Sequence, residues 1–370
     1  MSGLSGLSGL SGLSGLSGLS GLSGLSGLAA YVDPALTQAL IGGRSALVGP
    51  FQGVTLPVDL PLPLDDPERL AQWDAIPRLQ VCGLALLAGM RFSVNQNKES
   101  VTLGFVDLDR KPLKDYSLVR LVRPSKAVFR QQLDLVANYA ELREERASEI
   151  LTQMVPQVPF WASIVGLQAH RHKWTLELVA LSLSLASHVE MRFKHAFACP
   201  RPVELSPQIQ PMIPTPGHAS WPCGHATEAY MVSGILQALL PNGATYGEQL
   251  ERQAARISVN RTVAGLHYQV DNAVGRLLGA ALAEFFVARC IRNAKLHERG
   301  FIGPNFHGPK NTVIDFDPRV SMTDNKSGYY EYDKSPISNG KSPSSTGSVA
   351  CSPLLAFMWA EAAKEWQSLK

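Results

Sequence analysis

The sequence predicts an all-α fold, a helical bundle preceded by a less regular N-terminal annex, and three observations support this prediction. Residues 127–153 place apolar side chains at helical spacing. Residues 174–195 form a long, mostly apolar stretch, and residues 267–291 are rich in the strong helix formers Ala and Leu. Turn signals such as Pro241-Asn242-Gly243 separate such stretches, as expected for helices joined by short loops.

Composition narrows the class of protein. With 370 residues, 45% hydrophobic and 18% charged, the chain can bury a large core. The net charge of +3 and the absence of long basic runs give no reason to expect nucleic acid as a partner. The five cysteines are scattered, without a CxxC pair, so we expect reduced thiols. Because no basic region precedes an apolar stretch at the N-terminus, we expect no export and a cytoplasmic location.

Composition also divides the chain into four parts. Residues 1–30 contain nine Ser-Gly-Leu repeats without proline and are expected to form a disordered tail. Residues 31–123 are expected to form the annex, in which proline-rich turns alternate with short apolar segments at 79–87 and 101–106. Residues 124–305 form the predicted helical domain. Residues 306–370 are expected to be a mobile extension with a possible terminal helix at 354–369.

The predicted helices of the main domain place its polar motifs. We expect helices at 127–153, 160–167, 174–195, 225–240, 246–259 and 267–291. The most apolar stretch, 178–189, is shorter than the roughly 20 residues that a membrane span needs. It therefore predicts a buried helix and no membrane span.

Two motifs combine cations with breaks in the chain. Lys194 and Arg201-Pro202 lie on either side of a helix end, so both cations could point into one cavity. The segment 216–227 contains proline and glycine turns just before a helix resumes at His225. The free backbone N–H groups at that helix N-terminus are suited to an anion.

A third motif combines a cation with a histidine and a carboxylate. Arg261 precedes His267 by six positions, and Asp271 follows His267 by four, on the same face of the predicted helix. The carboxylate could fix the tautomer of the imidazole. Each of these residues alone is more often an ordinary core or ion-pair residue, but their order and spacing together indicate one oxyanion pocket.

The three motifs resemble the signature of a known superfamily. Lys-x6-Arg-Pro, Pro-x-Gly-His and Arg-x5-His-x3-Asp, spanning 194–271, are similar to those of vanadium haloperoxidases and type 2 phosphatidic acid phosphatases (PAP2). The resemblance implies a helical bundle whose pocket holds vanadate or phosphate. It implies that Lys194, Arg201 and Arg261 neutralise the anion's oxygens and that the Gly224 N–H donates another hydrogen bond.

The resemblance also implies roles for the histidines. In a vanadate enzyme, His267 would be the axial ligand of the metal and His225 the acid–base group that assists peroxide. In a phosphatase, His267 would attack phosphorus, Asp271 would orient it and His225 would protonate the leaving oxygen. Algal-type bromoperoxidases resemble this chain in the placement of His218, which could then tune peroxide protonation or halide access.

Two positions bear on the choice between these reactions. Cys223 stands where the family usually has serine, and a thiol is a poorer hydrogen-bond donor. Near a helix N-terminus and three cations this thiol could ionise readily and be oxidised by peroxide or hypohalite, which argues against a haloperoxidase. Asn260, before Arg261, resembles haloperoxidases more than phosphatases.

Three hypotheses follow. The first is a vanadium-dependent haloperoxidase that oxidises bromide or iodide with hydrogen peroxide. The second, favoured by the short spacings between the motifs, is a phosphatase that hydrolyses phosphomonoesters through a phosphohistidine, with phosphate in the pocket and no cofactor. The third is a degenerate member that only binds phosphate or a partner. The aromatic residues of 354–369 could form a homodimer face or dock within the chain.

Overall fold

The computed structural model describes residues 34–50, 53, 61, 63–108, 113–154, 157–335 and 351–367. The Ser-Gly-Leu repeats, predicted to be disordered, lie outside the described residues. The helices of the main body run as follows: α4 (Ala75–Leu87), α5 (Lys126–Gln131), α6 (Leu133–Tyr139), α7 (Arg143–Thr152), α8 (Val158–Val165), α9 (Lys173–Phe197), α10 (Pro202–Leu205), α11 (Gly224–Leu239), α12 (Gly243–Val263), α13 (Gln269–Cys290) and α14 (Pro353–Gln367).

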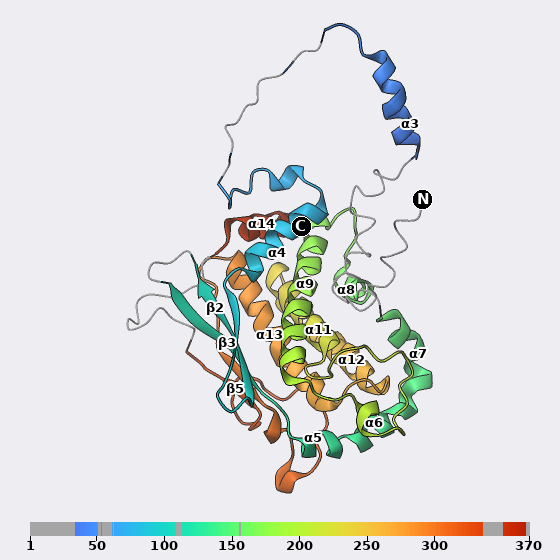
Figure 1. The fold of residues 1–370 in the computed structure, drawn as a ribbon, viewed down its shortest axis with the longest axis vertical. Coiled ribbons are helices and arrows are strands. Elements are labelled where there is room, and N and C mark those ends of the chain that lie inside the picture. Colours follow the sequence, from blue (N-terminus) through green and yellow to red (C-terminus); the bar gives the residue numbers. More distant parts are fainter. Residues whose placement is uncertain are drawn as a thin grey trace.

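Four long helices, α9, α11, α12 and α13, form the centre of the molecule (Figure 1). Helix α11 lies between α12 and α13 and is buried along nearly its whole length. Close packing with α13 depends on small residues, because a Cβ added at Gly275 would lie 2.6 Å from the Cβ of Ala226 and 2.9 Å from the carbonyl oxygen of Cys223. The start of α11 and the start of α13 are thereby brought together.

The predicted all-α fold is wrong, because a five-stranded sheet packs beside the bundle (Figure 1). Its strands follow the order β1 (Met90–Val94), β2 (Ser100–Asp107), β3 (Lys114–Val122), β4 (Arg299–Ile302) and β5 (Tyr330–Tyr332). All neighbours are antiparallel except β3 and β4, which are parallel with Leu121 opposite Phe301.

The sheet escaped prediction for a physical reason. A short apolar run such as 101–106 has no periodicity that separates a strand from a loop or a buried helix turn. The sheet also depends on partners that are far apart in the sequence. Strands β4 and β5 follow β3 only after the four long helices. Residues of β2, β3 and β4 then join the same core as the helices, including Leu103, Leu121 and Phe301.

The predicted helix at 127–153 is also different in the structure. It is divided into α5, α6, a 3-10 turn (Ala140–Leu142) and α7, with a first break at Gln132. The side chain of Gln132 is buried, and its Oε1 accepts a hydrogen bond from the backbone N–H of Val270 at 3.0 Å. Short segments can follow the curved surface of the bundle where a single straight helix could not.

The described part of the C-terminal region contains a strand and a helix. Residues 330–332 form β5, and α14 packs on α9 through buried residues that include Met358 and Trp359. The carboxylate of Glu365 accepts hydrogen bonds from the backbone N–H groups of Trp174 and Thr175 at 2.7 and 2.9 Å, and so caps α9. The aromatic face of this helix is therefore docked within the chain and is not an exposed dimer surface.

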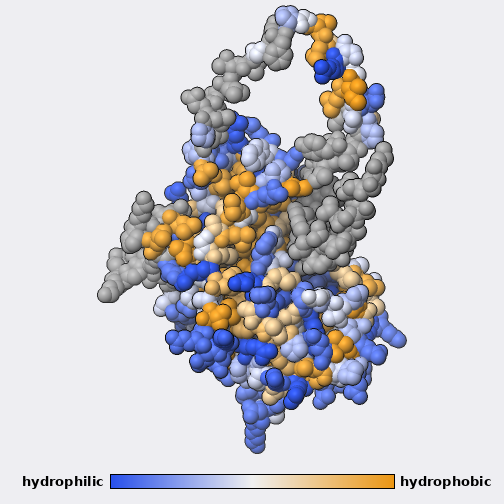
Figure 2. All heavy atoms as spheres, viewed as in Figure 1, coloured by the Kyte–Doolittle hydropathy of each residue, from blue (hydrophilic) through white to orange (hydrophobic). Residues whose placement is uncertain are grey.

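The N-terminal helix α3 (Pro34–Gly43) contrasts with the body of the molecule. Its described side chains are all exposed, and Leu40 and Ile41 keep 69% and 62% of their surface accessible. Figure 2 shows orange, apolar surface on this helix at the top of the view. Among the residues that the structure describes, we find no helix with the length and apolar character needed to cross a membrane.

Candidate active site

The fold brings the three sequence motifs to one place. Helix α9 ends just after Lys194, Arg201 precedes α10, Gly224 begins α11, and α12 ends two residues after Arg261. The loop before α11 is tied to α13 by a hydrogen bond from the Cys223 N–H to the carbonyl of Asp271 at 3.1 Å. The residues predicted from separate segments therefore line one buried region.

His267 is held in one tautomer. Its Nδ1 lies 2.8 Å from Oδ2 of Asp271, and its Nε2 lies 2.8 Å from Nη1 of Arg201. Because a guanidinium can only donate, Nε2 must carry the lone pair and Nδ1 the proton, which it donates to the carboxylate. Burial, followed by the charge of Arg201, lowers the pKa of His267 well below its usual value. The ring is thus neutral, and its Nε2 lone pair accepts a hydrogen bond from Arg201.

The position of His267 differs from the prediction. It lies just before α13, outside the helix, and Asp271 is the third residue of that helix. The Asp271 carboxylate turns back over the helix start, where it accepts hydrogen bonds from the Tyr268 N–H at 3.3 Å and from the hydroxyl of Ser220. His267 and Asp271 therefore meet at the start of α13 and do not share a face of the helix.

Arg201 is fixed from three sides. Besides His267, its guanidinium donates to the carbonyl of Leu266 and to the carbonyl of His218, both at 3.1 Å. Its Nη2 also lies 3.2 Å from Nδ1 of His218, an atom that is 3.1 Å from the carbonyl of Ala219 as well. Burial lowers the pKa of His218 to about 4, so this half-buried ring is neutral. His218 therefore braces Arg201, a role that does not depend on peroxide or halide.

Lys194 and Arg261 are buried cations, each 1% exposed. The Lys194 ammonium donates to the carbonyls of Ala219 and Ser220 at 3.1 and 2.9 Å. Arg261 donates to Oε1 of Gln153 at 2.9 Å. Burial lowers the pKa of both groups, and for Arg261 it does so to about 10. Among the described residues, neither group makes a direct ion pair with a carboxylate.

His225 and the two residues before it form the start of α11. The Nε2 of His225 donates to the carbonyl of Gln153 at 3.0 Å, and burial lowers its pKa to about 3. Gly224 is the first residue of the helix, where a backbone N–H has no partner within the helix. Such a terminus is suited to an anion.

Cys223 does not ionise readily, contrary to the expectation from its neighbours. The thiol is fully buried, and desolvation raises its pKa to about 12 despite the nearby charge of Lys194. Burial therefore outweighs the helix terminus and the cations at this position. All five cysteines are free thiols, as predicted.

Sequence reasoning missed four residues that complete the site. Gln153 binds Arg261 and Asn260 through its side chain and His225 through its carbonyl. Glu190 and Glu228 are buried carboxyl groups close to Lys194. The fourth residue is Ser220. Helical spacing could have indicated Glu190, four positions before Lys194, and Glu228, three after His225, whereas nothing in the sequence links Gln153 to α12.

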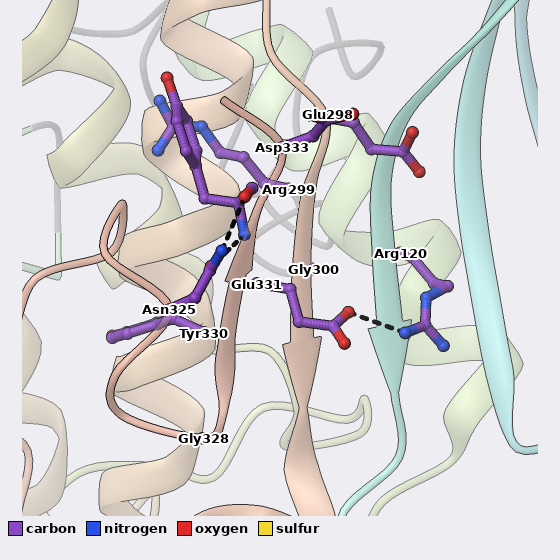
Figure 3. A pocket seen from close by; sticks show the side chains of 10 residues that line it. Arg120, Glu298, Arg299, Gly300, Asn325, Gly328, Tyr330, Glu331 and Asp333 are labelled. Atoms are coloured by element: carbon purple, nitrogen blue, oxygen red, sulfur yellow. Dashed lines mark hydrogen bonds and ion pairs between the residues drawn. The ribbon is translucent and has the colours of Figure 1, made fainter. Parts of the chain in front are cut away.

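A second hollow, of about 630 Å³, lies on the sheet and contains none of the predicted site residues. Figure 3 shows its polar side chains paired with one another: Arg120 contacts Glu331 at 2.7 Å, and Asn325 contacts the main chain of Tyr332 at 2.7 and 3.0 Å. Arg299 is neutralised by Glu284 at 2.7 Å.

Comparison with known proteins yields one finding on the fold. No family model matches the chain, and no curated protein does. Among solved structures, a transmembrane PAP2-type phosphatidylglycerolphosphate phosphatase from Bacillus subtilis is similar at 17% identity and a TM-score of 0.35, over 43% of this chain and 84% of that chain. With so partial a match, the function has to be argued from the site itself.

Proposed function

We propose that this protein is a phosphatase that hydrolyses phosphomonoesters through a phosphohistidine formed on His267. The observation that carries the proposal is the state of His267. The ring is neutral, its proton is held on Nδ1 by Asp271, and its Nε2 lone pair faces Arg201. This is the arrangement of a nucleophile oriented by a carboxylate and aimed at an anion-binding cation.

The surrounding groups supply what phosphoryl transfer requires. Lys194, Arg201 and Arg261 are available to stabilise charge on the transferred oxygens, and the start of α11 adds backbone donors. When Nε2 attacks phosphorus, the bond to the leaving oxygen breaks and that oxygen takes a proton. His225 is the proton donor in this proposal, once the bound anion has raised its pKa. Water then attacks the phosphohistidine and gives its proton back to His225, and the N–P bond breaks to release phosphate and free His267.

The halogenating reaction is the less well supported alternative. Vanadate is tetrahedral like phosphate, so the same cations and His267 would hold it. The thiol of Cys223 does not decide between the two reactions, because in its buried, protonated form it is a poor target for peroxide or hypohalite. Asn260 is occupied by Gln153 and Glu149, at 3.0 and 2.9 Å, and so offers no contact specific to peroxide chemistry.

The test compares His267→Ala with a matched histidine variant. We expect His267→Ala to lose at least about a thousandfold in hydrolysis of para-nitrophenyl phosphate, because the nucleophile is gone. His188→Ala, at an exposed position of α9, should retain full activity. Rapid quenching of the wild-type protein should trap an acid-labile phosphohistidine, located at residue 267 by mass spectrometry.

Two outcomes would contradict the proposal. Full activity of His267→Ala would exclude this residue as nucleophile. Alternatively, the wild-type protein could fail to hydrolyse any phosphomonoester and yet brominate a phenol dye when vanadate, peroxide and bromide are all present. That result would establish the vanadate reaction in its place.

A further inference from the structure

Two buried carboxyl groups lie beside the cations of the site. Glu190 is one helical turn before Lys194 on α9 and is 1% exposed. Glu228 is four residues after Gly224 on α11 and is 6% exposed. A Cβ added at Gly224 would lie 2.5 Å from both carboxylate oxygens of Glu190. The Glu190 carboxyl group therefore lies against the start of α11, where the proposed anion would accept backbone hydrogen bonds.

The role of Glu190 is not that of a structural ion pair. Among the residues that the structure describes, its buried Oε2 has no hydrogen-bond partner. Glu177, a buried carboxylate elsewhere on α9, shows the contrast: it receives two hydrogen bonds from Arg78, at 2.6 and 2.7 Å. A buried oxygen without a partner is costly unless the group is protonated or a ligand completes its contacts.

The charge balance of the pocket indicates which of these applies. Lys194, Arg201 and Arg261 carry three positive charges, and Asp271, Glu190 and Glu228 can carry three negative ones. With all three carboxylates ionised the empty pocket is neutral, and a dianion would leave two uncompensated negative charges in a buried space. Protonation of both glutamates would restore neutrality when a dianion is bound.

Resting on the proposed function, we propose that Glu190 and Glu228 link anion binding to proton uptake: as a tetrahedral dianion enters, the pair takes protons from solvent, and the acid form of Glu190 faces the anion. These two residues would then weaken anion binding at alkaline pH. Lys194 and His225 also titrate in this pocket, but both are unchanged in a Glu190→Gln variant, which therefore isolates the contribution of Glu190.

The surroundings of Glu190 define the pH range. Burial raises the pKa of Glu190 to about 7, although Lys194 and Arg201 oppose the shift. Burial and the charge of Glu190 also raise the pKa of Glu228. The titratable and charged groups of the packed elements are Lys194 of α9, Arg201 before α10, Cys223, His225 and Glu228 at the start of α11, Arg261 of α12, and His267 and Asp271 at the start of α13.

The sign of the effect follows from these pKa values. Below about pH 7 Glu190 already holds its proton, so anion affinity should be nearly constant. Above about pH 7 the proton must be acquired on binding, and affinity should fall by about tenfold per pH unit for each proton taken up.

Sulfate is the appropriate probe, because it is a tetrahedral dianion at every pH used and does not turn over. Binding to the full-length protein would be measured by calorimetry from about pH 6 to about pH 9, in buffers of different ionisation enthalpy, which reports proton uptake directly. We expect uptake of at least about one proton at about pH 8. Glu190→Gln should lose about one proton of uptake and bind sulfate about tenfold more tightly than wild type at about pH 8.

A matched control and a second measurement keep the inference testable. Glu248→Gln, at an exposed position of α12, should behave as wild type. Sulfate binding by the wild-type protein without proton uptake overturns the inference even if Glu190→Gln does not fold. An unchanged pH dependence in a folded Glu190→Gln protein also overturns it.

The same data separate this inference from the proposed function. If the wild-type protein binds no sulfate at any pH, both fail, since the pocket then does not take oxyanions. If sulfate binds with the expected proton uptake but no phosphohistidine forms during phosphomonoester hydrolysis, only the proposed function is overturned.

Discussion

Replacement of Asp271 by Asn tests the proposed nucleophile with almost no change of shape. Oδ2 of Asp271 accepts the Nδ1 proton of His267 at 2.8 Å, and the amide group of Asn would offer a donor there. The proton of His267 would then move to Nε2, where Arg201 already donates at 2.8 Å. Two donors would face each other, and the attacking lone pair would be lost.

The magnitude follows from the loss of that tautomer. The corresponding change in Ser-His-Asp triads lowers kcat by about ten-thousandfold, or about 5 kcal/mol in activation free energy, and we expect a loss of about a thousandfold or more here. The assay is steady-state hydrolysis of para-nitrophenyl phosphate. Sulfate binding should persist, because Lys194, Arg201 and Arg261 are unchanged and one negative charge has been removed.

Controls separate chemistry from folding in this experiment. Asp134→Asn, at an exposed position of α6, should leave kcat unchanged. Circular dichroism and sulfate affinity report whether Asp271→Asn keeps its fold and pocket. A folded variant that binds sulfate and retains more than about a tenth of the wild-type kcat would refute the assigned tautomer and, with it, the role of Asp271.

Three further predictions concern positioning and pH. Gln153→Leu removes the acceptor that holds Arg261 at 2.9 Å, and we expect chemical denaturation to show a stability loss of about 2–4 kcal/mol, with weaker sulfate binding. His225 has its pKa lowered to about 3, so its neutral form stabilises the fold above its ordinary pKa of 6.5, and this contribution is lost as pH falls toward 3. Between about pH 7 and about pH 4 the free energy of unfolding should fall by about 3 kcal/mol less in His225→Gln than in wild type, as measured by chemical denaturation. Hydrolysis should show a bell-shaped pH profile, falling below about pH 6 as Asp271 protonates and above about pH 7 as Glu190 ionises; a flat profile across this range would contradict both assignments.

The helices and the motif residues were predictable to different degrees. The long helices α9, α11, α12 and α13 lie within a few residues of their predicted ranges, because periodicity and turn residues are local signals. The sheet was not predictable in this way, since its short apolar runs have no distinctive periodicity and β4, which pairs with β3, lies far along the chain. The segmented path of α5 to α7 likewise depends on the surface against which it packs.

By itself the sequence determined which residues would meet. They lie at or near the ends of helices that pack together: Lys194, Arg201, Gly224, Arg261 and His267. Only the tertiary structure decided their chemical states. Burial keeps Cys223 a thiol and His267 neutral, and it leaves Glu190 as a protonatable group against the start of α11. Desolvation is a property of the whole surrounding core, so no spacing of residues along the chain can report it.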